Sequence, residues 1–201
     1  FGVNITYEVQ EVARGIADAL LIGCGLGRSD EVTEVVCTLL CEAACPIVLD
    51  ADGINALSGH MDALSRRRNR ITVLTPHEGE FVRAGGDLSP GRERAAADFA
   101  REHGVYLVLK GPGTVVAGPD GRCRVNTTGN CGMAKGGSGD VLSGVVLALL
   151  GLGMDAFDAC CCAVWLHGRA GDLAAQEKGQ WGMTPTDLLE RLPQALREVT
   201  E

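Results

Sequence analysis

Short apolar runs alternate with longer amphipathic segments through the first half of the chain. The apolar runs cover residues 19–23, 46–50, 71–75 and 105–109. Each has the length of a buried strand, roughly 4–8 residues. Two amphipathic segments, at about 31–44 and 90–103, have the spacing of helices. This alternation predicts an α/β fold in which helices cover both faces of a mostly parallel sheet.

Turn and cap signals refine this pattern. The sequence SPGRERAAADFAREHG predicts that Ser89 caps the second helix, with Pro90 in its first turn and Gly104 closing it. Between residues 113 and 126, a GPDG turn is expected to join two short strands as a hairpin. From residue 139 onward the pattern is mostly helical.

The composition is that of a globular domain and excludes several classes of protein. With 46% hydrophobic residues, the 201-residue chain can bury a full core and is most simply one domain over residues 1–201. A formal net charge of −8 argues against nucleic-acid and anionic-membrane partners. We interpret the basic cluster RRRNR at 66–70 as a solvated face rather than a binding patch. No apolar run approaches the roughly 20 residues of a membrane helix and no signal-peptide pattern is present, so we expect a cytoplasmic protein.

Nine cysteines raise the question of a metal site or disulfides. Cys37, Cys41 and Cys45 are spaced by four and would share one helix face, but three thiols without a fourth ligand make a poor zinc site. The run at 160–162 faces several directions and cannot converge on one ion. We therefore predict reduced, structural thiols, no dedicated metal site and a reducing compartment.

A glycine-dense turn, TGNCGMAKGGSGDVLSG at 128–144, leads into an apolar helix. Its glycines lack the Cβ that would keep a ligand away from the backbone, so successive N–H groups can converge on an anion at the helix N-terminus. We predict an anion hole at Gly137, Ser138 and Gly139, with Asp140 placed to deprotonate an acceptor hydroxyl. The alternative is a flexible surface loop. The apolar run that follows at once and the carboxylate beside the anion site favour the functional interpretation.

The segment GNCGMAKGGSGDVLSG resembles the signature of the ADP-dependent NAD(P)H-hydrate dehydratases, a carbohydrate-kinase branch of the ribokinase-like superfamily. Six further segments follow the order of that family: ADALLIGCGLG at 17–27, VLDADGINAL at 48–57, TPHEGEFVRAGG at 75–86, LKGPGTVVAGPDG at 109–121, AVWLHGRAGDLAA at 163–175 and TPTDLLERLP at 184–193. Essentially the whole chain is covered. The resemblance implies a three-layer ribokinase-like fold.

Two departures from the family pattern stand near the front of the chain. Family members usually carry several tens of residues before the equivalent of ADALLIG, so we expect an N-terminally truncated domain, either a fragment or one half of a nicked protein. The loop GCGLG has Cys24 where the family usually has proline. Both glycines are kept, and the turn is expected to survive.

The resemblance also implies roles for individual residues. It assigns nucleotide binding to Lys110, Gly111, Pro112, Gly113, Thr114 and Gly139. It assigns binding of the hydrated dinucleotide to Gly25, Gly27, His77, Glu80 and Asp140. Alternatives remain for two of them: Lys110 as a strand-end lysine that extends to solvent, and His77 as a cap of the next turn. His167 and Asp172 lie on an apolar helix, where a core histidine bonded to backbone is the favoured interpretation.

The reaction implied by the resemblance is dehydration of hydrated NADH or NADPH, coupled to hydrolysis of ADP, or of ATP in some members. Asp140 would act as the base, and AMP and phosphate would be released. Mg²⁺ would arrive with the nucleotide, held partly by waters, so no dedicated protein ligand is assigned. Asp50, Asp52 and Asn55 crowd one loop and are placed to orient a magnesium ion or a substrate ribose.

Two other functions stay open at this stage. One is a ribokinase-like vitamin kinase acting on a hydroxymethylpyrimidine or hydroxyethylthiazole, which would share the glycine-loop aspartate. The other is a nucleotide-binding remnant without turnover. The resemblance further implies a homo-oligomer, a tetramer in relatives, and an NAD(P)HX epimerase as functional partner.

Overall fold

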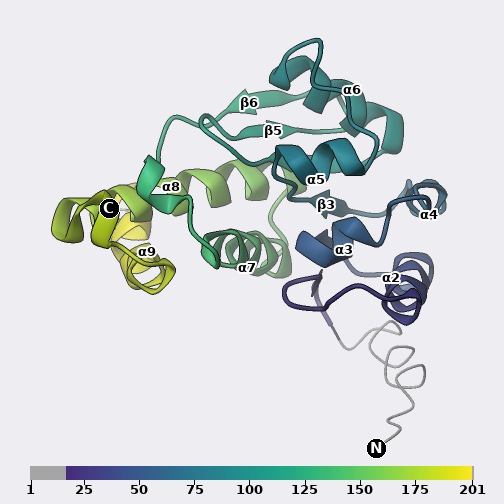
Figure 1. The fold of residues 1–201 in the computed structure, drawn as a ribbon, viewed down its shortest axis with the longest axis horizontal. Coiled ribbons are helices and arrows are strands. Elements are labelled where there is room, and N and C mark those ends of the chain that lie inside the picture. Colours follow the sequence, from purple (N-terminus) through teal and green to yellow (C-terminus); the bar gives the residue numbers. More distant parts are fainter. Residues whose placement is uncertain (1–16, 201) are drawn as a thin grey trace, which may run out of the picture.

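The computed structural model describes residues 17–200, which form a six-stranded mixed sheet with helices on both faces (Figure 1). The strands are β1 (Leu20–Ile22), β2 (Ile47–Leu49), β3 (Thr72–Leu74), β4 (Tyr106–Leu109), β5 (Val115–Ala117) and β6 (Cys123–Val125). They lie in sequence order, β1 to β4 parallel and β5 and β6 antiparallel. All four predicted parallel strands and the predicted hairpin are confirmed.

Alternation along the strands divides the apolar side chains between two cores. Ile47 and Leu49 of β2 join the first core, whereas Val48 between them joins the second. The helices between β1 and β4 are α2 (Asp30–Glu42), α3 (Ala51–Asn55), α4 (Asp62–Ser65), α5 (Glu78–Arg83) and α6 (Arg92–His103), and they supply the first core. Connections between parallel strands are right-handed, and here each one leads to the next strand on the same side. All the connecting helices therefore lie on one face of the sheet.

The opposite face of the sheet is covered by the C-terminal helices. These are α7 (Ser138–Gly151) and α8 (Ala156–Gly182), with α9 (Pro185–Thr200) packed against α8. A short 3₁₀ helix, η1 (Cys131–Met133), precedes α7. The three-layer architecture is thus the predicted one. Between residues 17 and 200, no helix combines the length and apolar character needed to cross a bilayer.

Three local predictions are wrong. Ser89 does not cap α6 and Pro90 is not in its first turn: the N-cap is Gly91 at φ 92°, the helix begins at Arg92, and the Ser89 hydroxyl donates to Asp87. The helix does close at Gly104, as predicted, with φ 68°. α2 ends at Glu42, so Cys45 lies beyond it and does not share its face with Cys37.

The cysteines are all free thiols, and their environments differ. Cys160 is buried in the second core, and Cys37 packs partly against the first, as expected of structural thiols. Four others, in contrast, are exposed: Cys24, Cys123, Cys131 and Cys162. The interpretation as structural thiols therefore holds for some of the cysteines and not for these four.

The basic cluster at 66–70 is not simply a solvated face. The Arg67 side chain is 1% exposed, and its Nε donates to Thr72 Oγ1 at 3.0 Å. Its two Nη atoms donate to the carbonyl oxygens of Ala43, Cys45 and Ile71. The carbonyls of Ala43 and Cys45 follow the end of α2 and accept no backbone N–H in the described chain, whereas the Ile71 carbonyl, just before β3, also accepts from the Ile47 N–H at 3.1 Å. Arg67 is a structural cation that ties the two segments together.

Candidate active site

The loops that follow the four parallel strands meet at one edge of the sheet. The Lys110 ammonium, after β4, lies 2.7 Å from Asp50 Oδ1, after β2. The Gly27 N–H, after β1, donates to Asp52 Oδ2 at 3.0 Å. His77, after β3, pairs as an isolated parallel bridge with Lys110. Because the carboxyl ends of parallel strands share one edge, sequence positions far apart are brought into one crevice, as predicted.

Asp50 is the buried centre of this edge. Its side chain is 1% exposed and accepts from the Ala51 N–H at 2.9 Å, from Lys110 Nζ and from the Ser143 hydroxyl at 2.6 Å. Burial alone would raise the pKa of Asp50. The charge of Lys110 and the hydrogen bonds from Lys110 and Ser143 outweigh burial, and the pKa lies below its usual value. Asp50 is therefore an ionised anchor that holds Lys110 and α7.

The predicted grouping of Asp50, Asp52 and Asn55 is not what the structure shows. Asp52 turns to the neighbouring loop, where it accepts from Gly27 and pairs with Arg28 at 3.1 Å. The Asn55 side chain donates to Asp52 at 3.2 Å. Asp50 faces the other way, so the three do not converge on one ion or ribose.

Asp140 lies in the first turn of α7, exposed beside the Asp50 anchor. One carboxylate oxygen from each of the two residues and the Cys24 sulfur lie within 4.8 Å of one another. Burial, followed by the nearby Asp50 charge and a hydrogen bond with Asp140, raises the pKa of the Cys24 thiol to about 11. The thiol thus stays protonated and able to donate to Asp140. No sequence signal predicted this contact.

The N-terminus of α7 offers backbone N–H groups to a ligand. Gly137 caps the helix at φ 95°, a conformation that favours glycine. The Ser138 N–H donates to the Lys135 carbonyl at 3.2 Å, so this member of the predicted anion hole is already engaged. In the part of the chain that the structure describes, no acceptor faces the N–H groups of Gly137, Gly139 and Asp140. These amides, at the positive end of a 14-residue helix, form a site for an anion.

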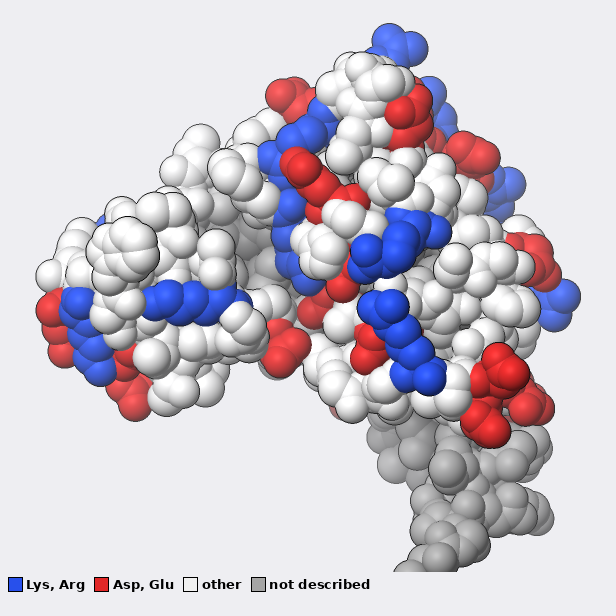
Figure 2. All heavy atoms as spheres, in the orientation of Figure 1, with Lys and Arg blue, Asp and Glu red and all other residues white. Residues whose placement is uncertain are grey.

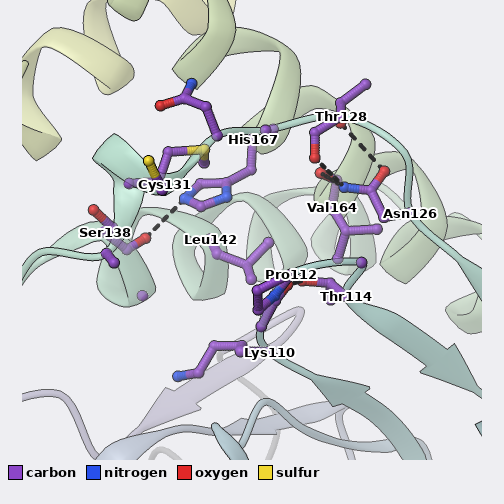
Figure 3. A pocket seen from close by; sticks show the side chains of 18 of the residues that line it. Lys110, Pro112, Thr114, Asn126, Thr128, Cys131, Ser138, Leu142, Val164 and His167 are labelled. Carbon is purple, nitrogen blue, oxygen red and sulfur yellow. Dashed lines mark hydrogen bonds between the residues drawn. The ribbon is translucent and has the colours of Figure 1, made fainter. Parts of the chain in front are cut away.

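A cavity of about 590 Å³ opens beside this helix end (Figure 3). Its volume is in the range that holds a nucleotide-sized ligand. All the residues predicted to bind the nucleotide line it: Lys110, Gly111, Pro112, Gly113, Thr114 and Gly139. Its remaining wall includes apolar side chains of Met133, Leu142 and Val164. Figure 2 shows a hollow on this face, between the end formed by α8 and α9 and the body that carries the sheet.

Arg92 holds the KGPGT loop in place, a role that the sequence did not predict. Its Nη2 donates to the carbonyl oxygens of Leu109 at 3.1 Å and Lys110 at 3.2 Å. Its Nη1 donates to those of Gly113, at 3.2 Å, and Pro112. The loop is therefore shaped before any ligand binds.

Gly25 and Gly27 lie apart from this cavity wall, with φ of 67° and 79°. A site for the hydrated dinucleotide at these glycines stays a prediction, and so does the role of Glu80.

His77 lines the cavity and also caps α5. Its Nδ1 accepts from the Gly79 N–H at 3.0 Å, and the Glu80 side chain accepts from the His77 N–H at 2.9 Å. The capping alternative is thus present in the structure, while the ring remains available to a ligand.

Two residues of α8 hold the glycine turn. Asp172 accepts from the Gly129 N–H at 2.9 Å and from Asn130 Nδ2 at 3.0 Å. The His167 ring lies 2.8 Å, through Nε2, from the Ser138 carbonyl oxygen (Figure 3). Its bond to backbone was predicted. Its place in the cavity wall was not.

Taken chemically, the site joins an exposed carboxylate, a fixed ammonium group and free helix amides at the mouth of a nucleotide-sized cavity. A carboxylate can remove a proton from a hydroxyl, and the cation and amides can stabilise charge on a phosphoryl group. The arrangement is suited to phosphoryl transfer onto a hydroxyl.

Comparison with known proteins agrees with this chemistry. The family model for NAD(P)H-hydrate dehydratase matches residues 5–194. A bifunctional NAD(P)H-hydrate repair enzyme Nnr from Thermofilum pendens is 43% identical over 189 residues, which cover 92% of this chain and 36% of that protein. An ADP-dependent (S)-NAD(P)H-hydrate dehydratase from Neisseria meningitidis is 38% identical, over 81% of this chain and 57% of that protein. This chain therefore spans little more than a third of the Nnr protein.

A solved structure of a protein from the same family as these relatives is also similar to this chain. The ADP/ATP-dependent NAD(P)H-hydrate dehydratase from Bacillus subtilis, co-crystallised with ATP and Mg²⁺, superposes with a TM-score of 0.84 at 34% identity. The match covers 95% of this chain and 68% of that one.

Proposed function

Because the chain belongs to the NAD(P)H-hydrate dehydratase family, we propose that it dehydrates (S)-NAD(P)H hydrate to NAD(P)H with ADP, or ATP, as co-substrate. One observation supports this above the others: Asp140, Lys110 and the free amides of α7 meet at the mouth of a cavity that could hold the nucleotide. The direct test is to incubate the chain with hydrated NADH and ADP and to follow the absorbance of restored NADH. Absence of restoration under conditions where ADP binds would overturn the proposal.

The proposed reaction has two steps. Asp140 removes the proton of the substrate hydroxyl, whose oxygen attacks the terminal phosphoryl group of ADP, and AMP leaves. The amides of Gly139 and Asp140, together with Lys110, stabilise the charge on the transferred group. The resulting phosphate ester is a better leaving group than hydroxide. Loss of a proton from the neighbouring ring carbon then expels phosphate and restores the nicotinamide double bond.

Magnesium is part of this proposal as a companion of the nucleotide. The Asp50 carboxylate could help hold it, with waters and phosphate oxygens as further ligands, while the Asp140 carboxylate, within 4.8 Å of it, is left free to act as the base. The oxygens of Asp50 already accept three hydrogen bonds and have little capacity left for a metal ion. The protein would therefore supply few of the magnesium ligands, and waters and phosphate oxygens would supply the rest. Bound there, Mg²⁺ would neutralise phosphate charge. Cys24 would be a poor ligand for so hard a cation.

ADP should raise the melting temperature of the protein by several degrees. A ligand that binds only the folded state stabilises it by about 2.7 kcal/mol at a hundred times its dissociation constant. Thermal unfolding with ADP, AMP and adenosine measures the effect, and adenosine should be the weakest because it lacks the phosphates that α7 would hold. No shift at millimolar ADP would favour a remnant that has lost the nucleotide site.

A substitution at His77 should separate a dehydratase from a vitamin kinase. A dinucleotide contacts a long crevice beyond the reacting hydroxyl, whereas a small vitamin alcohol does not. His77→Asn keeps an N-cap acceptor for α5 but removes the imidazole. We expect kcat/KM for the hydrated dinucleotide to fall about 3- to 10-fold, the value of one hydrogen bond, with AMP affinity unchanged.

The matched control for this substitution is His60→Asn, because His60 is exposed and outside the cavity wall. An equal loss of AMP affinity in His77→Asn would place the residue in the nucleotide half of the site. Phosphorylation of a thiazole or pyrimidine alcohol by the unaltered chain would identify a vitamin kinase instead.

Partners and location follow from the same proposal. An epimerase that supplies the S form of the hydrate would be the functional partner, as the bifunctional name of the relatives suggests. We also propose a homo-tetramer in the cytoplasm. Sedimentation analysis and localisation of a tagged chain test these two points.

A further inference from the structure

One residue of the cavity wall has no part in the mechanism above. His167 lies near the middle of α8, and its ring projects toward the first turn of α7 (Figure 3). Its Nε2 is 2.8 Å from the Ser138 carbonyl oxygen. A carbonyl oxygen only accepts hydrogen bonds, so Nε2 carries the proton and Nδ1 does not. The contact therefore fixes both the tautomer and the orientation of the ring.

The Ser138 carbonyl belongs to the peptide group whose N–H is that of Gly139. A peptide group is planar, and in the trans form its C=O and N–H point in opposite directions. The Ser138–Gly139 peptide group lies in the first turn of α7, and a hydrogen bond to the Ser138 oxygen adds to the helix geometry in fixing the direction of the Gly139 N–H. That N–H is among the amides at this helix end that have no acceptor in the described part of the chain.

We propose that His167 is a positioning residue for phosphoryl transfer: its Nε2–H bond to the Ser138 carbonyl aims the Gly139 N–H at the transferred phosphoryl group. The inference rests on the proposed function. The Gly139 amide is also near Lys110, whose Nζ would lie 3.3 Å from a Cβ added at Gly139. The amide and the ammonium group can thus face the same anion.

The electrostatic state of the ring agrees with this role. Burial of the ring is the main effect that lowers the pKa of His167, to about 4, and the nearby Lys110 charge lowers it further. The hydrogen bond with the Ser138 carbonyl acts in the opposite direction and is outweighed. The ring is therefore neutral at physiological pH. A neutral ring donates to Ser138 without placing a second charge beside Lys110.

Other contacts between α8 and the glycine turn act farther from the reacting groups. Lys135 donates to the carbonyl oxygens at the end of α8, among them Trp181 at 3.0 Å, and Asp172 holds Gly129 and Asn130. These contacts fix where the turn lies. The His167 bond fixes the orientation of the peptide that faces the ligand, and this difference can be tested.

The test compares two amides that differ in reach. In His167→Gln an N–H can occupy the position of Nε2, whereas the shorter His167→Asn cannot reach Ser138. We expect His167→Asn to lower kcat for the hydrated dinucleotide about 10- to 100-fold. A well-aligned backbone donor of this kind accelerates the reaction about 10²- to 10³-fold, and a misaligned donor loses part of that acceleration. KM for ADP should change less than about threefold, and His167→Gln should recover most of the rate. His167→Leu replaces His167→Asn if the latter does not fold.

A second measurement separates this inference from the proposed function. AMP with aluminium fluoride imitates a phosphoryl group in transfer, and the fluoride should tighten AMP binding in the unaltered chain. His167→Asn should lose most of that gain while its affinity for AMP alone is kept, and His167→Gln should retain it. This holds even if no dehydration is seen, in which case only the proposed reaction fails.

Asp172→Ala is the matched control, since it loosens the same turn at its far end. Three results would overturn the inference: a normal rate and fluoride gain in His167→Asn, equal losses in the Gln and Asn variants, or a loss in Asp172→Ala as large as that in His167→Asn. Any of these would make His167 a packing residue only.

Discussion

Replacing Asp140 with asparagine should lower turnover about 10² to 10⁴-fold while nucleotide affinity is kept. The amide has nearly the shape of the carboxylate but cannot accept the proton of the substrate hydroxyl. Asp140 is exposed in the first turn of α7, and no Lys or Arg of the described residues pairs with it, so its removal leaves no cation unpaired. Steady-state kinetics with hydrated NADH, together with ADP titration, measure the two effects separately.

The control for Asp140→Asn is Asp30→Asn, which removes an acidic residue from the first turn of another helix, α2. Both changes weaken the favourable interaction with the helix dipole by a similar amount, a fraction of a kcal/mol. Only the change at Asp140 should affect turnover. Full activity in Asp140→Asn, or an equal loss in Asp30→Asn, would remove Asp140 from the role of base.

Replacing Arg67 with methionine should lower the free energy of unfolding by about 3–5 kcal/mol. Arg67 is 1% exposed and donates to the carbonyl oxygens of Ala43, Cys45 and Ile71. Methionine fills much of the space but has no donor, so the Cys45 oxygen loses its partner away from water, while the Ala43 and Ile71 oxygens keep only Arg70 and the Ile47 N–H. Burial lowers the pKa of Arg67 only to about 10, so the charged, fully donating form is the one lost at neutral pH.

Urea unfolding followed by circular dichroism measures this loss, with Arg66→Met as the matched control. The Arg66 side chain is 66% exposed and pairs with Asp62 at 3.2 Å one helical turn away. Such a surface pair contributes about 0.3–0.5 kcal/mol. A destabilisation of Arg67→Met no larger than that of Arg66→Met would show that water replaces the guanidinium donors.

The sheet was predictable because parallel strands are buried on both faces and read as uninterrupted apolar runs. Each of β1 to β4 begins one residue later than the corresponding run, since the first residue of a run still belongs to the connection. Arg67 could not be placed in the same way. Two of the carbonyl oxygens that it binds, those of Ala43 and Cys45, belong to residues more than 20 positions away, and the sequence of a basic cluster does not indicate them.

The residues of the candidate site also fall into those that the sequence indicated and those that it did not. Sequence motifs indicated Asp140 and Lys110 because their side chains stand in glycine-rich loops at strand or helix ends. His167 and Arg92 were not assigned to the site because they act on backbone carbonyls of other segments. A pattern of side chains carries no information on which carbonyl will be left without a partner.

The sequential order of the strands has a consequence for biosynthesis. In the described sheet each strand pairs with its predecessor in the chain, so loop closures stay short and each unit can be added as it leaves the ribosome. The helices that cover Val48, Val73 and Val108 come last, in α7 and α8. Until some 50 further residues have followed β4, this half-built sheet presents an apolar face to solvent. We expect nascent chains stalled after residue 126 to expose this apolar face until α7 and α8 have been made.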